Sequence, residues 1–153
     1  MVFPSINGKN LLRQKIALPQ DFIGKVNLVF VAFQQWQQQE VDTWGPVAGV
    51  LENQFEGLAY YELPTFQTSN IIYRMFINEG MRVGIPNHKS RERTVTLYLD
   101  KIEFRRALEM ADEDHIYTLL VDRDGQVFHS TRGSYNPEAG ERLRQELQKL
   151  LPR

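Results

Sequence analysis

The chain has no cysteine among its 153 residues, and this absence excludes a large class of chemistry. Without a thiol there is no disulfide, no thiolate nucleophile and no thiolate-ligated metal. Thiol–disulfide exchange needs a thiolate as the attacking group, so the chain cannot act as a thiol oxidoreductase or a cysteine peroxidase. The absence does not identify the compartment, because a protein without thiols is compatible with any redox potential.

Long apolar runs and an excess of charge of one sign are also missing. No window approaches 18 uninterrupted apolar residues, so we expect no transmembrane helix. The first twenty residues resemble neither a secretory signal nor a transit peptide, and we therefore predict a cytoplasmic, bacterial protein. The formal net charge of −1 gives no electrostatic reason to expect nucleic acid as a partner.

Histidine is scarce, and its spacing is not that of a metal site. His88, His115 and His129 are far apart in the sequence, although a hairpin would bring His115 and His129 near each other. The segment 122–125, "DRDG", lacks the further oxygen ligands of a calcium loop and is predicted to be a hairpin turn. No glycine pattern matches a phosphate-binding loop, so we predict no metal and no cofactor.

The sequence does contain a regular alternation of strand and helix patterns. The nearly continuous apolar run 26–33 is typical of a strand covered on both faces. Apolar residues at three- and four-residue steps then predict a helix over 40–56, which either begins near Pro46 or continues through it with a kink. Its apolar stripe consists of Val41, Trp44, Val47, Leu51 and Phe55.

The remaining elements follow from caps, turns and alternation. Pro64 is expected to stop the strand that begins at residue 58, and Asp100 and Asn136 are predicted helix caps. The expected elements are one edge strand within 1–19, a strand in 58–66, a helix from Ser69–Asn70 to about 84, a basic loop in 85–93, a strand in 94–99, a helix over 100–111, hairpin strands in 115–122 and 126–132, and a final helix over 137–151.

Without the insertion near 65–99, this order resembles the thioredoxin fold in its peroxiredoxin-like form. The stretches "GKVNLVFVAF" and "TLLVDRDGQV" are similar to the first central strand and the hairpin of that superfamily. The resemblance covers about 20–151. It implies an α/β, three-layer fold with a central mixed sheet of about four to six strands flanked by helices. It also implies a single domain, 1–153, with 1–19 as a lead-in.

Trp36 stands where this superfamily has a tryptophan just before its two active-site cysteines. On that alignment the former cysteine positions are Gln37 and Glu40, the residues between them are Gln38 and Gln39, and the former cis-proline region is Ile116 and Tyr117. The resemblance therefore implies a frame that has kept its shape and lost its redox chemistry. We expect 37–39 to be solvated and Trp44 to lie in the core.

A narrower resemblance is to the mitochondrial assembly factors for subunit 6 of ATP synthase. It rests on the blocks "VDTWGP", "YYELPTF", "EFRRALEM" and "YTLLVDRDGQVFHSTRGSYNPEAGERL". It implies a chaperone-like assembly function, a hydrophobic membrane subunit as the protein partner, and peripheral contact with the membrane.

We therefore predict a non-catalytic binding or assembly protein. The candidate partner-binding residues are Trp36, Gln38, Gln39, Phe66, Ile72, Met75, Phe76, Lys89, Arg91 and Arg93. Two alternatives stay open. One is an enzyme that uses Glu40 with Tyr117 or His115 as acid and base, and the other is a small-molecule carrier or sensor.

Overall fold

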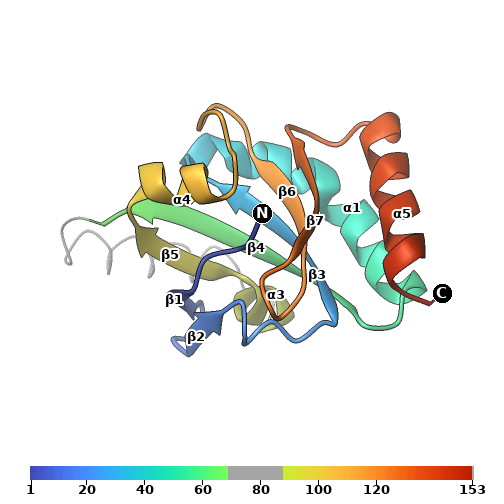
Figure 1. The fold of residues 1–153 in the computed structure, drawn as a ribbon, viewed down its shortest axis with the longest axis horizontal. Coiled ribbons are helices and arrows are strands. Elements are labelled where there is room, and N and C mark those ends of the chain that lie inside the picture. Colours follow the sequence, from blue (N-terminus) through green and yellow to red (C-terminus); the bar gives the residue numbers. More distant parts are fainter. Residues whose placement is uncertain (69–87, 153) are drawn as a thin grey trace.

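A mixed sheet organises the residues that the computed structural model describes, 1–68 and 88–152 (Figure 1). The strands are β1 (Ile6–Asn10), β2 (Lys15–Leu18), β3 (Val26–Ala32), β4 (Leu58–Gln67), β5 (Val95–Leu99), β6 (Tyr117–Val121) and β7 (Val127–Arg132). Their order in the sheet is β2-β1-β5-β4-β3-β6-β7. The strands β3, β4 and β5 are parallel, and the other neighbours pair antiparallel. The predicted α/β fold with a mixed central sheet is confirmed.

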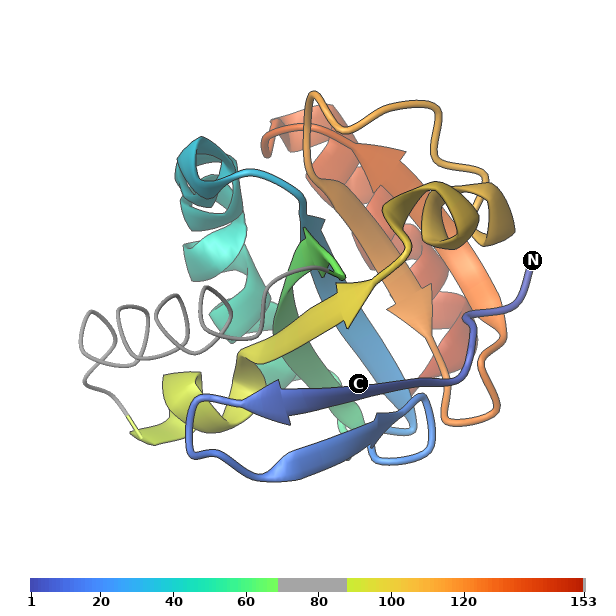
Figure 2. The same ribbon diagram turned by 90° about the vertical axis from the view of Figure 1, so that its left-hand side faces the viewer.

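Helices cover both faces of this sheet (Figure 2). The helices α1 (Gln38–Gln54) and α5 (Pro137–Leu150) pack on one face, and α4 (Lys101–Ala107) packs on the other. Successive side chains of β3 point to opposite faces, so Phe30 packs with Trp44 of α1 while Val31 joins the cluster that contains Phe104 of α4. Burial on both faces explains why β3 is almost entirely apolar.

The helix predicted over 40–56 is α1, and it runs through Pro46. The proline lacks the N–H for one helical hydrogen bond. The apolar stripe outweighs this loss, because Val41, Trp44 and Leu51 are all buried against the sheet. Of the two alternatives for Pro46, the continuous helix is therefore the one that forms.

Three local predictions were wrong. The strand β4 does not stop at Pro64. Pro64 lies opposite Ala32, the last residue of β3, and from Thr65 onward β4 pairs with β5. The proline therefore lacks its N–H at the point where the pairing with β3 ends. The predicted basic loop contains a short helix, α3 (His88–Arg93). The helix that Asp100 caps ends at Ala107, four residues before the predicted end.

The N-terminal segment contributes more than one edge strand. It forms β1 and β2, and β1 pairs with β5 inside the sheet, so the sheet has seven described strands instead of the four to six expected. The caps at Asp100 and Asn136 are confirmed, and Gly125 takes a positive φ of 91° in the hairpin turn. The helix predicted from Ser69–Asn70 lies outside the described residues. Within 1–68 and 88–152, no helix combines the length and the apolar character needed to cross a bilayer.

Glu62 is an ionisable side chain in the middle of β4, on the face that α1 covers. Burial raises the pKa of Glu62, a hydrogen bond from Gln38 opposes that rise, and the nearby charge of Asp42 adds to it. The folded chain therefore favours the protonated carboxyl more than the unfolded chain does. Glu62 contributes fully to stability below its ordinary pKa of 4.5, and the contribution is lost as the pH rises through the folded-state pKa.

Glu62→Gln should therefore stabilise the protein at neutral pH. The amide cannot ionise and keeps an oxygen for Gln38, so the free energy of unfolding at pH 7 should exceed that of the wild type. The difference should shrink near pH 4, and urea denaturation at both pH values measures it. The control is Glu56→Gln, an exposed change that should alter stability by less than about 0.5 kcal/mol. Lower stability of Glu62→Gln at pH 7 would contradict the argument.

Candidate functional site

The two former cysteine positions lie at the carboxyl end of β3, where the chain enters α1. One 3-10 turn, η1 (Gln35–Gln37), connects the strand to the helix. Gln38 and Gln39 are exposed, as predicted, but Gln37 is fully buried, so the prediction of a solvated side chain there was wrong. Glu40 is also buried, with 7% of its surface exposed. Buried polar groups need partners.

Gln37 finds its partners on both sides of the turn. Its Oε1 accepts hydrogen bonds from the backbone N–H of Phe33 at 2.8 Å and of Gln34 at 3.3 Å. Its Nε2 donates to the carbonyl oxygen of Glu113 at 2.6 Å, and the same oxygen accepts from Gln34 Nε2 at 2.8 Å. The side chain thus ties the end of β3 to the loop before β6.

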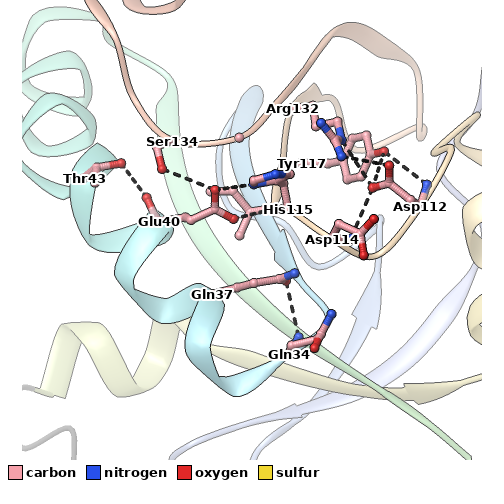
Figure 3. A network of polar contacts seen from close by, with 12 residues as sticks. Gln34, Gln37, Glu40, Thr43, Asp112, Asp114, His115, Tyr117, Arg132 and Ser134 are labelled. Carbon is pink, nitrogen blue, oxygen red and sulfur yellow. Dashed lines mark hydrogen bonds and ion pairs between the residues drawn. The ribbon is translucent and has the colours of Figure 1, made fainter.

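Glu40 forms a second tie to that loop (Figure 3). Its Oε1 accepts from the backbone N–H of Ile116 at 3.1 Å. Its Oε2 lies 2.7 Å from His115 Nδ1 and accepts from Ser134 Oγ at 3.3 Å. The carboxylate therefore joins α1 to the chain before β6 and to the chain after β7. Next to it, Thr43 Oγ1 donates to the backbone oxygen of Glu40 at 2.6 Å.

These contacts use up the main-chain groups of the former cis-proline region. The N–H of Ile116 donates to Glu40, and its carbonyl oxygen accepts from the N–H of Gly133 at 2.8 Å. The carbonyl oxygen of Glu113 accepts from two glutamine side chains. A molecule that approaches here therefore meets side chains and not these backbone groups.

Acidic residues of the same loop are mostly neutralised. Arg132 holds Asp112 at 2.8 Å, and its hydrogen bond lowers the pKa of Asp112 below the ordinary value. Glu113 is held by Lys101 at 2.8 Å and by Arg105 at 3.1 Å. These pairs fix the loop against α4 and β7.

Tyr117 does not reach Glu40. Its hydroxyl hydrogen-bonds to Asp112 Oδ1 at 3.4 Å, so the predicted acid–base pair of Glu40 with Tyr117 does not form. The alternative partner, His115, is the one that the fold places beside Glu40.

The two tryptophans differ as predicted. Trp44 is fully buried, and its Nε1 donates to the carbonyl oxygen of Gly133 at 3.1 Å. Trp36 is 46% exposed, its Nε1 donates to Gln34 Oε1 at 3.2 Å, and its ring lies edge-on to His115 at a centroid distance of 6.3 Å. Trp36 is therefore the aromatic group that this end of the sheet offers to solvent.

Gln38 and Gln39 adjoin Trp36 in the first turn of α1, and the other described residues predicted to bind a partner belong to β4 and α3. Phe66 is half-buried and stacks on Tyr98 at 5.6 Å. Lys89 and Arg93 of α3 both pair with Glu52, at 2.7 and 3.0 Å. Glu52 lies about 20 Å along α1 from its start, at 1.5 Å per residue. Arg91, also on α3, accepts the N–H of Leu11 with its carbonyl oxygen. The predicted contacts Ile72, Met75 and Phe76 lie outside the described residues.

The histidines do not converge. In the hairpin register His129 faces Leu120, whereas His115 precedes β6, so the expected proximity of these two was wrong. Burial lowers the pKa of His129, whose Nε2 has no hydrogen-bond partner in the described part of the chain. Within that part, no group of three or more histidine or acidic side chains could hold a metal ion.

Sequence reasoning missed two members of this site. Glu113 contributes its carbonyl oxygen and Ser134 its hydroxyl, and both lie more than 70 residues from Gln37 and Glu40. No local sequence signal marks either residue, because their role depends only on the contact that folding creates.

Comparisons with known proteins identify the fold but give no match to a family model or a curated protein. Among solved structures, a thiol:disulfide interchange protein from Bacteroides sp. matches with a TM-score of 0.61 and 19% identity, over 96% of this chain and 88% of that one.

Two further solved structures share this arrangement. A lipoprotein thioredoxin from Streptococcus pneumoniae matches with a TM-score of 0.60 and 9% identity, over 95% of this chain and 99% of that one. BsSco, a member of the Sco family of cytochrome c oxidase assembly proteins, matches with a TM-score of 0.61 and 12% identity, over 96% and 94%. The chain therefore has a thioredoxin-like fold, and without cysteine it lacks the thiol–disulfide chemistry for which the Bacteroides protein is named.

Gln37→Ala should destabilise the protein by about 2–4 kcal/mol, since it leaves buried backbone groups without partners and opens a cavity. Chemical denaturation measures the change. The matched control is Gln39→Ala, an exposed glutamine two residues away, which should change stability by less than about 0.5 kcal/mol. Equal effects of the two substitutions would mean that Gln37 does not hold the loop.

Proposed function

We propose that the chain is a non-catalytic binding protein that contacts a protein partner through the surface around Trp36. We call this surface the Trp36 face and define it by Gln34, Gln35, Trp36, Asp114 and His115. The first three belong to or adjoin η1, and the last two belong to the loop that Gln37 and Glu40 hold in place. All five are exposed or half-exposed.

The observation that carries the proposal is the contrast between buried and exposed residues within one short motif. Gln37 and Glu40 are buried and engaged in hydrogen bonds, while Trp36 leaves 46% of its surface in water. A large aromatic ring on a rigid base is the residue type that most often anchors a protein–protein contact. The base is rigid because Gln37 and Glu40 are tied to buried or partly buried backbone groups of Phe33, Glu113 and Ile116.

A narrower form of the proposal concerns the class of partner. The blocks that resemble ATP synthase assembly factors favour a subunit of a membrane complex, bound while that complex assembles. The support is the order and spacing of those blocks in the sequence. One structure with this fold belongs to the Sco family of cytochrome c oxidase assembly proteins. It shows only that the fold occurs among assembly proteins.

The basic residues of α3 give little support to contact with anionic lipid. Lys89 and Arg93 are both held by Glu52, so their charge is partly neutralised within the protein. A protein partner at the Trp36 face is therefore the better supported proposal.

Catalysis by Glu40 and His115 has one favourable observation, their 2.7 Å contact. A carboxylate that orients an imidazole is a common arrangement for general base catalysis. However, Ser134 donates to Glu40 and not to His115, so this hydroxyl is not held by the imidazole as a nucleophile would be. The groove found between α1 and α5, of about 360 Å³, is lined by residues such as Val50 and Pro137 and not by His115. We therefore do not propose catalysis.

Affinity capture with two matched variants tests the binding proposal. The tagged protein is incubated with native membrane and soluble extracts, and the captured chains are identified and quantified. Trp36→Ala should reduce the captured partner roughly tenfold or more, as loss of a binding anchor does. Val50→Ala removes a side chain of similar exposure, 54%, from a different surface and should leave capture unchanged.

The result that overturns the proposal is a partner captured equally by wild type and Trp36→Ala, or no specific partner at all. Acrylamide quenching supplies a second measurement. Only Trp36 is accessible, since Trp44 is fully buried, so a bound partner should protect the accessible fraction of the fluorescence.

A further inference from the structure

Two hydrogen-bond donors of the Trp36 face are used inside the protein. Trp36 Nε1 donates to Gln34 Oε1, and Gln34 Nε2 donates to the carbonyl oxygen of Glu113. His115 directs Nδ1 at Glu40 Oε2, at 2.7 Å, so this ring nitrogen is also used inside the protein. These two donors and this ring nitrogen are therefore not available to a partner.

The loop 112–114 carries three successive carboxylates, and among the described residues two of them pair with cations. Arg132 neutralises Asp112, and Lys101 and Arg105 hold Glu113. Asp114 is exposed, and its one contact in the described part of the chain is its own N–H, which donates to Asp112 Oδ1 at 3.2 Å. No described cation forms an ion pair with the Asp114 carboxylate.

Asp114 is held close to Trp36 by its two neighbours in the sequence. The carbonyl oxygen of Glu113 accepts from Gln34 and Gln37, on either side of Trp36 in the chain. The ring of His115 lies against the ring of Trp36. A carboxylate that no described cation pairs and an exposed indole therefore belong to the same surface.

From this set we infer that the Trp36 face takes an arginine side chain of its partner. This deepens the proposed binding function and rests on it. A guanidinium group stacks on an indole ring and donates two parallel hydrogen bonds to a carboxylate, so one side chain satisfies both groups. Lysine offers a compact charge that does not stack in this way, and it should bind more weakly.

Other partner chemistries fit the same surface poorly. An acidic side chain would be repelled by the exposed carboxylate of Asp114. An apolar side chain would cover Trp36 at the cost of removing water from the Asp114 carboxylate without replacing its hydrogen bonds. The surface therefore discriminates by charge as well as by shape.

Short capped peptides test the inference without knowledge of the natural partner. The indole N–H resonance of Trp36 in ¹⁵N-labelled protein is followed during titration with Gly-Arg-Gly, Gly-Lys-Gly, Gly-Gln-Gly, Gly-Leu-Gly and Gly-Glu-Gly at constant ionic strength. We expect saturable shifts with the arginine peptide, weaker shifts with lysine, and the smallest with glutamate. High salt should weaken the arginine response by screening.

Two variants with the same change of charge locate the effect. Asp114→Asn should weaken binding of the arginine peptide roughly twofold to fivefold, the effect of one exposed ion pair. Glu56→Gln, at the far end of α1, removes an exposed charge away from the face and should leave binding unchanged.

Three results would overturn the inference. They are equal responses to the arginine, glutamine and leucine peptides, no effect of Asp114→Asn, and no response to any peptide. If Trp36→Ala abolishes partner capture while arginine shows no preference, the inference fails and the proposed function stands. If capture is also insensitive to Trp36→Ala, both fail.

Discussion

The site depends on one constraint, which is that two polar side chains buried at the end of β3 must find partners in a distant loop. Gln37 meets the carbonyl oxygen of Glu113, and Glu40 meets the N–H of Ile116. Each contact joins residues more than 70 positions apart. A buried amide or carboxylate without a partner would cost several kcal/mol, so the loop before β6 has little freedom once β3 and α1 are in place. The position of His115, and with it the environment of Trp36, follows from these two contacts.

The same contacts explain how a thioredoxin-like frame persists without thiols. Two cysteines can bond to each other, and the link then stays within one helical turn. An amide and a carboxylate cannot form such a covalent bond. Gln37 and Glu40 instead hydrogen-bond to the loop before β6, so they connect η1 and α1 to that loop. In this chain the carboxyl edge of the sheet is a fixed support, because Gln37 and Glu40 bond to the backbone groups of Glu113 and Ile116. Under the proposed function, a partner would therefore meet exposed side chains at this edge.

Local rules predicted most of the frame, and long-range contacts account for what they missed. The strand β3, the helix α1 and the caps Asp100 and Asn136 were predictable because their signals lie within a few residues. The burial of Gln37 was not predictable, since a run of glutamines is normally solvated and only the carbonyl oxygen of Glu113 makes burial tolerable. The continuation of β4 through Pro64 was not predictable either. It depends on the register of β4 with β3 and β5, which no local sequence pattern indicates.

The charges around the Trp36 face matter because the fold alone does not determine what this chain binds. The three structures compared above share 9–19% of their residues with this chain, so the fold alone selects no ligand. Under the proposed binding function, selection comes from the charge balance of a few side chains: Arg132 pairs with Asp112 and Lys101 with Glu113, while no described cation pairs with Asp114. An unpaired carboxylate is stable in water and costly to cover with anything but a cation. A partner that covers Trp36 must therefore bring a positive charge, or leave Asp114 its water.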